Sequence, residues 1–180
     1  MQNPGFVQRT LARPGFLEAM VGLSVLTALS GVLMPVVRHE VGESRGLDAR
    51  RDMQSIAEGL AAWSHDTLYL PTGTEGRTNV AWLYGPGNIP AHQPFATGGE
   101  ARSLADVLLN PSMGGERWAG PYTRTGLHAD PWGNAYLINV DGFLSPREQA
   151  VILCAGPNGR IESAADATRP IGDDLLLCID

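Results

Sequence analysis

An uncharged, apolar run of 19 residues, AMVGLSVLTALSGVLMPVV, extends from Ala19 to Val37 and decides how the chain is organised. As an α-helix with a rise of about 1.5 Å per residue, it reaches roughly 28 Å, close to the roughly 30 Å hydrocarbon core of a bilayer. Residues 1–16 carry Arg9 and Arg13 and no acid, whereas residues 38–52 mix Arg with Asp and Glu. This unbalanced positive leader predicts a single membrane span with a cytoplasmic N-terminus.

Three interpretations of this run agree with its flanks. A cleaved signal peptide would use Ala28-Leu29-Ser30 as its small-x-small site, although that tripeptide lies inside the apolar run. A plain single-span anchor needs no cleavage. The third interpretation rests on the junction Arg13-Pro14-Gly15-Phe16-Leu17-Glu18, where a basic leader ends in Gly and is followed by Phe and by an acid at the edge of the apolar run.

This junction resembles the processing site of the type IV pilin superfamily, which favours the third interpretation. The resemblance implies that a prepilin peptidase cuts after Gly15 and methylates the new N-terminal Phe16. It also implies that the Glu18 carboxylate faces the amine of a neighbouring subunit in a filament. Glu18 would be the third residue of the mature chain, where the family has the fifth, and the helix-kinking Pro35 also comes two residues early. A deletion of two residues just after Phe16 explains both offsets.

Beyond the span, apolar residues at helical spacing predict that the helix continues from Leu47 to Ser64. Gly42 and Gly46 weaken the helix between its two halves, so we expect a flexible joint there. Residues 72–101 are rich in Gly, Pro, Thr and Asn and are expected to form a long loop, followed by a short helix over 104–109. Within this loop, Trp82, Leu83 and Tyr84 would either pin the loop to the body or form a short strand.

Three apolar segments in the last third of the chain predict strands over 135–140, 150–154 and 175–179. A hairpin turn at Asp141-Gly142 would join the first two. This order predicts an α+β fold in which a long N-terminal helix, membrane-spanning in its first half and amphipathic in its second, packs on a small antiparallel sheet of about three strands. The predicted parts are a leader (1–15), a transmembrane or filament-core helix (16–37) and a periplasmic globular domain (38–180).

Motifs in the predicted globular domain resemble those of the major, G-type pseudopilin of the type II secretion system, and they imply its pilin-like fold. The strongest are Trp118-x-Gly120-Pro121-Tyr122 and Asp130-Pro131-Trp132-Gly133-x-x-Tyr136, which follow one another in the family's order. Gly156-x-x-Gly159 and Gly172-Asp173-Asp174 continue the resemblance. The loops at 72–101 and 160–171 are longer than those of the family.

The resemblance implies one Ca²⁺ in the C-terminal loop, where the family binds this ion and fixes the end of the sheet. Carried over by motif, its ligands would be the side chains of Asn158, Asp173 and Asp174 and the carbonyls of Ala155 and Ile171. Carboxylate and carbonyl oxygens are the ligands that Ca²⁺ prefers. Asn158 stands where the family has Asp and brings no charge. A solvated turn is the alternative interpretation.

The chain has two cysteines, Cys154 and Cys178, and each lies in a predicted strand. An even pair in an extracytoplasmic domain predicts a disulfide, which would contribute roughly 3 kcal/mol through the entropy of loop closure. Two buried free thiols are the alternative.

Composition excludes several classes of function. Apolar residues make up 43% of the chain and charged residues 18%, which excludes disorder driven by high charge and low hydrophobicity. The 13 basic residues are all Arg and face 19 acids, for a formal net charge of −6, so we expect no nucleic-acid partner. The four His are scattered, no nucleophile motif occurs, and Gly85-x-Gly87 lacks the third Gly of a nucleotide fingerprint, so we do not expect an enzyme.

These observations predict a structural subunit that assembles into the periplasmic pseudopilus of a type II secretion system and helps to drive protein export. The expected partners are further copies of the chain, other pseudopilins, prepilin peptidase, the inner-membrane assembly platform and the membrane itself. The alternative is a minor type IV pilin or a membrane-anchored adhesive module, whose binding surface would be the loop 72–101 with Trp82, Tyr84 and Phe95. A membrane-anchored enzyme is a more distant alternative.

Overall fold

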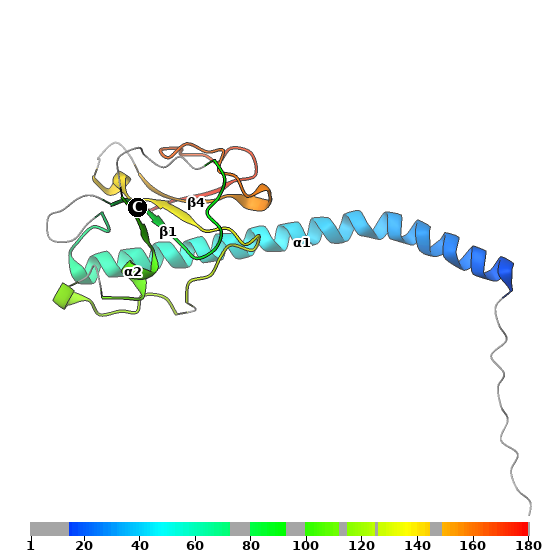
Figure 1. The fold of residues 1–180 in the computed structure, drawn as a ribbon, viewed down its shortest axis with the longest axis horizontal. Coiled ribbons are helices and arrows are strands. Elements are labelled where there is room, and N and C mark those ends of the chain that lie inside the picture. The colour runs from blue at the N-terminus through cyan, green and yellow to red at the C-terminus, as the bar shows by residue number, and fades with distance from the viewer. Residues whose placement is uncertain are drawn as a thin grey trace, which may run out of the picture. The chain divides into compact units, whose positions relative to one another are not determined.

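A computed structural model describes residues 15–72, 80–92, 100–111, 115–124, 126–144 and 149–179 of the chain. The chain divides into two compact units, residues 1–42 and 43–180, and one helix, α1 (Phe16–Thr67), contributes to both. The described part of the first unit is Gly15 and the first half of α1, and the second unit holds the sheet (Figure 1). Apart from Gly15, the predicted leader lies outside the described residues.

The helix α1 is continuous through Gly42 and Gly46, where the sequence predicted a flexible joint. A Cβ added to either glycine would meet no heavy atom within 4 Å, so packing requires neither of them. α1 ends at Thr67, beyond the predicted Ser64. The N–H of Leu68 still donates to the carbonyl of Ser64 at 2.9 Å, but Leu68 has a left-handed φ of 60° and ends the helix.

The second unit contains a five-stranded mixed sheet with the strand order β2-β1-β3-β4-β5. β1 is antiparallel to β3, β3 to β4 and β4 to β5, whereas β1 and β2 run parallel. The strands are β1 (Val80–Tyr84), β2 (Glu100–Ser103), β3 (Leu137–Asn139), β4 (Ala150–Cys154) and β5 (Leu175–Ile179). The predicted α+β fold is therefore confirmed, with β3, β4 and β5 as the three antiparallel strands. β1 and β2 are two further strands, and most of their residues lie in the predicted loop 72–101.

The two added strands have different character. β1 is buried along most of its length, as its sequence VAWLY favours, and it pairs with β3 from Trp82 to Tyr84. β2 is an edge strand whose residues Glu100, Ala101 and Arg102 are exposed, and the side chains of Glu100 and Arg102 form an ion pair at 3.5 Å. β2 thus extends the sheet through backbone pairing with β1 and adds little to the core.

Short helical elements connect the strands. The predicted helix over 104–109 is present as α2 (Ala105–Leu108), and the Ser103 hydroxyl accepts a hydrogen bond from the N–H of Ala105 at 3.3 Å. Instead of a tight hairpin at Asp141-Gly142, the structure has a 3₁₀ helix, η2 (Asp141–Leu144), and the connection from β3 to β4 continues through residues outside the described part. Two further 3₁₀ helices are η1 (Gly115–Arg117) and η3 (Gly156–Asn158).

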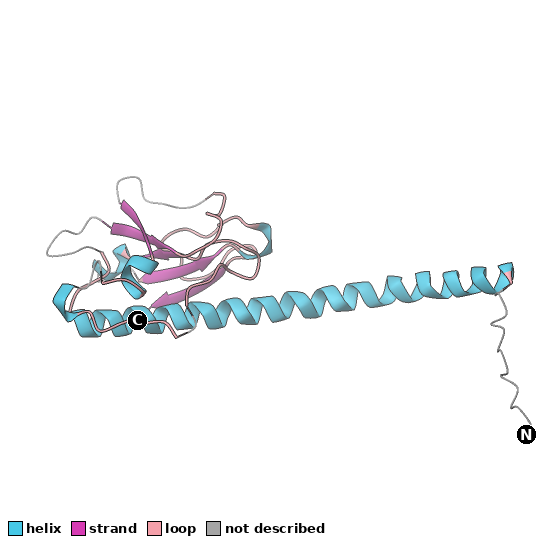
Figure 2. Cartoon of the chain, turned by 60° about the horizontal axis from the view of Figure 1, so that its bottom comes forward, coloured by secondary structure: helices cyan, strands magenta, loops and turns pink. Residues whose placement is uncertain are grey.

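The second half of α1 covers one face of the sheet, as Figure 2 shows. Strand residues alternate between the two faces of a sheet, so one set of strand side chains meets the apolar stripe of the helix. This confirms the predicted amphipathic half of the helix. The buried residues of this layer include Met53, Ile56, Leu60 and Trp63 from α1 and Leu83, Ile138 and Ile152 from the strands.

The opposite face of the sheet forms a second apolar cluster, covered by the long loop 160–171. Ile161 of this loop is buried against the sheet, and Asn139 Nδ2 donates to the carbonyl of Ala165 at 2.9 Å. Trp82 lies in this cluster and is only 1% exposed, so it belongs to the core and does not form the binding surface of the alternative hypothesis. Tyr84 is half-buried, and Phe95 lies outside the described residues.

Candidate functional sites

The first candidate site is the apolar surface of α1 within residues 16–42. Phe16 and Leu17 are 79% and 77% exposed, and the described large apolar side chains up to Val41 are all exposed within the chain. The helix is long and apolar enough to cross a membrane, and none of its most apolar 18-residue window is buried. A continuous apolar surface of this size needs lipid or other helices around it.

Three hydroxyl side chains interrupt this apolar surface without leaving unpaired donors. Ser24, Thr27 and Ser30 each donate to a helix carbonyl three or four residues earlier, at 2.8 Å. Bonds of this kind satisfy a hydroxyl inside its own helix. The segment can therefore enter an apolar environment without exposing these groups.

The predicted processing junction lies at the beginning of α1. Gly15 directly precedes the helix, Phe16 begins it, and the N–H of Gly15 donates to Oε2 of Glu18 at 3.0 Å. The Glu18 carboxylate thus lies over the first turn, where the helix dipole favours negative charge. A Cβ on Gly15 would meet no described heavy atom within 4 Å, so packing gives no reason for a glycine here. The sequence suggests another reason for Gly15, which is recognition of this junction by a processing peptidase.

The motif around Tyr122 packs directly on α1 inside the second unit. The Gly120–Pro121 peptide bond is cis, and the N–H of Tyr122 donates to the carbonyl of Leu108 at 2.9 Å. A Cβ on Gly59 of α1 would approach the carbonyl oxygen of Tyr122 to 2.8 Å. Gly59 is therefore the residue that lets this motif lie against the helix. The motif has a structural role in joining α1 to α2.

The motif that begins at Asp130 is a buried turn. Oδ1 of Asp130 accepts hydrogen bonds from the N–H groups of Trp132 at 2.9 Å and Asn134 at 2.7 Å. Oδ2 accepts a hydrogen bond from the thiol of Cys154 at 3.3 Å. Both carboxylate oxygens are thus used inside the fold, and Asp130 is only 4% exposed. The residue fixes the turn before β3 and is not available to a ligand.

Tyr136, the last residue of the same motif, reaches the helix. Its hydroxyl donates to Oδ2 of Asp52 at 3.1 Å. Burial of the ring, and to a lesser extent the negative charge of Asp52, raise the pKa of Tyr136 well above its ordinary value. The hydroxyl therefore keeps its proton and stays a donor to α1.

The C-terminal loop brings predicted metal ligands together. Asn158 lies at the end of η3, and its backbone N–H donates to Oδ2 of Asp173 at 3.0 Å. The Asn158 amide nitrogen also donates to Oδ1 of Asp173 and to Oε1 of Glu162, the latter at 3.0 Å. Sequence reasoning missed Glu162, because it lies in the added length of the loop and no family motif marks it.

The other three predicted ligands border this contact. Asp174 is only 3% exposed, and its Oδ2 accepts hydrogen bonds from the N–H groups of Glu162 at 2.9 Å and Ser163 at 2.7 Å. Its Oδ1 is buried and has no hydrogen-bond partner. Ile171 is exposed, and its carbonyl accepts from the N–H of Asp174 at 3.3 Å. Ala155 is fully buried between β4 and η3.

The chemistry of this loop fits a hard cation such as Ca²⁺. The side chains of Asn158, Glu162 and Asp173 that meet there carry carboxylate or amide oxygens. The buried Oδ1 of the neighbouring Asp174 accepts no hydrogen bond. Among the described residues, no group of three or more His, Cys, Asp and Glu is placed to hold a metal. Binding here would therefore need the Asn158 amide oxygen and backbone carbonyls beside the carboxylates. Calcium binding stays a prediction.

The predicted disulfide between Cys154 and Cys178 is not formed in the structure, and both thiols are free. In the register of β4 and β5, Cys154 lies opposite Leu175 and Cys178 lies opposite Val151, three positions away along the ladder. At about 3.3 Å per residue this separates them by roughly 10 Å, beyond the roughly 7 Å between Cα atoms that a disulfide tolerates.

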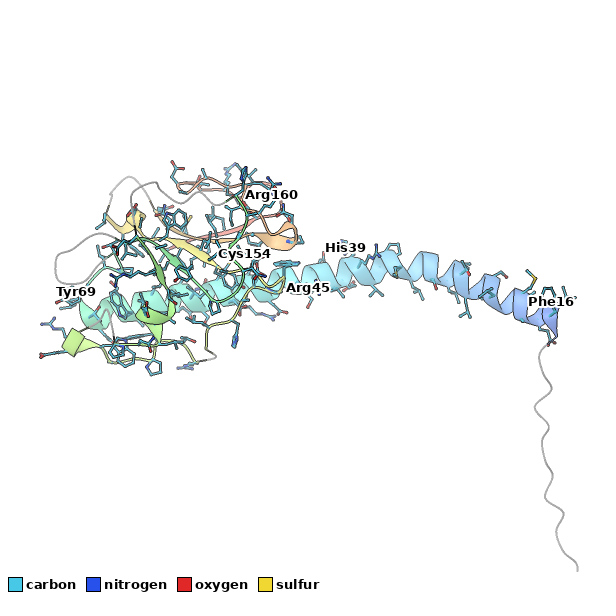
Figure 3. The ribbon with its side chains drawn as sticks, viewed as in Figure 1. Phe16, His39, Arg45, Tyr69, Cys154 and Arg160 are labelled. Carbon is cyan, nitrogen blue, oxygen red and sulfur yellow. The ribbon has the colours of Figure 1, made fainter. Side chains whose placement is uncertain are left out.

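The two cysteines also face opposite sides of the sheet. Cys154 packs in the cluster that faces α1, whereas Cys178 packs against the outer cluster. In Figure 3, Cys154 lies inside the second unit and Arg160 lies on the side of the sheet away from α1. The alternative of free thiols is therefore the one that the structure shows. Burial raises the pKa of the Cys154 thiol, which favours the protonated form that donates to Asp130.

Comparison with known proteins supports the resemblance seen in the motifs. Residues 99–169 match the family model of type II secretion system protein G. The match runs from β2 to the loop after η3 and includes the motifs around Tyr122 and Asp130. No curated protein and no solved structure matches the chain. The predicted resemblance to the G-type pseudopilins is therefore confirmed over these residues, and Ile171, Asp173 and Asp174 lie beyond them.

Proposed function

We propose, from the match of residues 99–169 to type II secretion system protein G, that this chain is a structural subunit of a periplasmic pseudopilus that drives protein export. The observation that carries the proposal is this family match. The exposed apolar side chains in the first half of α1 support it. That family is one of structural secretion-system subunits, so we assign the chain no catalytic role.

The apolar half of α1 would act in two environments. Before assembly it would span the inner membrane, with the N-terminus in the cytoplasm and the second unit in the periplasm. After assembly it would pack against the same segments of other copies and of other pseudopilins. Extraction from lipid would then be offset by helix packing, because apolar surface stays covered in both states.

Processing would convert the membrane-bound precursor into a subunit that can enter the filament. Prepilin peptidase would cut between Gly15 and Phe16 and methylate the Phe16 amine, and the inner-membrane assembly platform would add the mature subunit to the filament. Cleavage removes the N–H of Gly15, the group to which Glu18 is bonded in the uncut chain. The Glu18 carboxylate would then be free to pair with an amine.

Mass spectrometry of the chain from cells with and without an active prepilin peptidase tests this proposal. With the peptidase, we expect a chain that begins at Phe16 and carries one added methyl group. Without it, the chain should keep residues 1–15. A chain that begins near Gly31, or one that keeps Met1 although the peptidase is active, would contradict the proposal.

Two glycine variants make the test specific. Gly15→Val should block cleavage, because a branched side chain would stand at the bond to be cut. Gly22→Val is a matched control inside the same helix, since Gly22 also has no heavy atom within 4 Å of an added Cβ. We expect normal cleavage in this control. Filaments in sheared cell fractions, absent with Gly15→Val and present with Gly22→Val, would test the assembly step.

A further inference from the structure

The first turn of α1 engages both backbone groups of Gly15. The N–H of Gly15 donates to Oε2 of Glu18 at 3.0 Å, and its carbonyl accepts a hydrogen bond from the N–H of Ala19 at 3.0 Å. Gly15 is thus the N-cap residue of the helix, and Phe16, labelled in Figure 3, is its first residue. The peptide bond between Gly15 and Phe16 is therefore part of a closed helical turn.

The bond from Gly15 to the Glu18 carboxylate depends on the spacing of the two residues. A Glu three residues after the N-cap lies where its carboxylate can reach back to the N-cap N–H, which is one half of a capping box. The helix dipole also favours negative charge in the first turn. An acid two residues later, at Met20, would be rotated by about 200° around the helix and would lie beyond this N–H. The closed turn therefore follows from where this chain places its acid.

The closed turn opposes hydrolysis of the Gly15–Phe16 bond. In hydrolysis, the hydroxyl of a water molecule bonds to the carbonyl carbon of Gly15, the C–N bond breaks, and the remaining hydrogen of the water goes to the Phe16 nitrogen. Negative charge develops on the carbonyl oxygen during this attack and needs hydrogen-bond donors from the peptidase. In the structure this oxygen is already bonded to the N–H of Ala19 inside the helix. The turn must therefore open before a peptidase can act.

Opening of the first turn is fast compared with cleavage. Helical turns form and melt within about a microsecond or less. When opening and closing are faster than cutting, the rate of proteolysis follows the fraction of chains that are open. A helix cap lowers that fraction, because it stabilises the closed turn alone. The cap on Gly15 should therefore appear directly in the rate of processing.

We propose that Glu18 slows processing of the uncut chain by closing the first turn of α1 over the Gly15–Phe16 bond. The inference rests on the proposed function, because it needs a peptidase that cuts at this bond. It gives Glu18 a role before cleavage, which is separate from any pairing with an amine after cleavage. Glu18 is a positioning residue here, since it acts through the backbone of Gly15 and takes no part in the hydrolysis.

The rate at which a purified prepilin peptidase cuts the full-length precursor in detergent micelles tests the proposal. Initial rates are measured by mass spectrometry at precursor concentrations below the KM, so that they report kcat/KM. Glu18→Ala removes the carboxylate, and we expect cleavage about two- to tenfold faster than in the wild type, the range that one helix cap controls. Glu18→Gln keeps an acceptor at the same place, so its rate should stay near that of the wild type.

A second pair of variants leaves the Glu18 carboxylate in place. Ala19→Gly weakens the first turn, and we expect cleavage about two- to fivefold faster than in the wild type. Ala28→Gly is the matched control, because it makes the same change inside the apolar run and away from the junction. Its rate should equal that of the wild type. Hydrogen exchange of the Ala19 amide in the uncut chain is a second readout, and it should be faster in Glu18→Ala than in Glu18→Gln.

Equal rates in the wild type and in Glu18→Ala would overturn the proposal. Slower cleavage in both Glu18→Ala and Glu18→Gln would overturn it as well, and would mean that the peptidase recognises the charge directly. If Ala19→Gly were cut no faster than Ala28→Gly, cleavage would not depend on the first turn and the proposal would also fail. In each of these cases the cut after Gly15 leaves the proposed function standing, whereas no cut there in any variant would contradict that function itself.

Discussion

The hydroxyl of Tyr136 donates a hydrogen bond to Oδ2 of Asp52 at 3.1 Å, across 84 positions of the sequence. Asp52 lies on α1 within the second unit, and Tyr136 directly precedes β3. Their bond is a polar link beside the apolar contact between helix and sheet, to which Met53 and Ile56, just after Asp52 in the chain, belong. It joins the sheet to the helix whose other half would enter a filament.

Replacing Tyr136 with Phe should lower the free energy of unfolding of the second unit by about 1 kcal/mol, because one hydrogen bond is lost while the ring stays. Urea unfolding in detergent, followed by tryptophan fluorescence, measures the effect. Tyr69→Phe is the control, since Tyr69 is exposed after the end of α1. Equal losses in the two variants would show that the bond to Asp52 adds nothing.

Stability should fall at alkaline pH partly through Tyr136. Its pKa in the folded chain is raised above the roughly 10 of an unfolded tyrosine, so above that pH the unfolded chain releases a proton that the folded chain keeps. The contribution is fully present below pH of about 10 and is lost as the pH rises further. Tm measured from pH 8 to 11 should therefore fall more steeply in the wild type than in Tyr136→Phe. Parallel curves would contradict this prediction.

Two glycines of α1 should respond in opposite ways to alanine. Gly59→Ala should destabilise the second unit by about 1–3 kcal/mol, because the new Cβ would lie 2.8 Å from the backbone oxygen of Tyr122. Gly46→Ala should stabilise the helix by up to about 1 kcal/mol, since its Cβ would meet nothing within 4 Å. Urea unfolding of both variants gives the comparison. A stabilising Gly59→Ala would mean that the Tyr122 motif does not lie on the helix.

The cysteines should behave as two independent thiols. In the folded chain, Cys154 should resist alkylation, because it is buried, its thiol donates to Asp130, and burial raises its pKa. In denaturant without reductant, mass spectrometry should find both Cys154 and Cys178 alkylated. If alkylation of the denatured chain appeared only after reduction, the register of β4 and β5 given above would be wrong.

The parts of the fold that follow a clear hydrophobic period could be predicted from the sequence. Met53, Ile56, Leu60 and Trp63 recur at helical spacing, and their burial on the sheet follows from that pattern. β2 could not be predicted, because Glu-Ala-Arg-Ser has no strand pattern and is placed by pairing with β1. For β1 the sequence left two possibilities open, because Gly and Pro follow it closely: Trp82, Leu83 and Tyr84 could form a short strand or only pin the loop to the body, and the structure has the strand.

The candidate sites likewise include parts that could be predicted from the sequence and parts that could not. The contact between Asn158 and Asp173 could be expected from motifs, whereas Glu162 enters it through the path of a loop that no motif describes. The faces of Cys154 and Cys178 could not be predicted, because β4 and the part of β5 before Cys178 are apolar without interruption. Because such a run does not alternate between apolar and polar residues, the sequence does not show which side chains share a face of the sheet. The register of the two strands decides the face of each cysteine.

The exposed edge strand β2 bears on how copies of this chain can add to one another. Beyond β2 the sheet has no further described strand, and an unpaired edge is a template for strand addition between molecules. Glu100 and Arg102 lie on that edge, and a second sheet could join only by stripping water from both charges. The charges on β2 therefore disfavour cross-β addition between copies of this chain at that edge of the sheet.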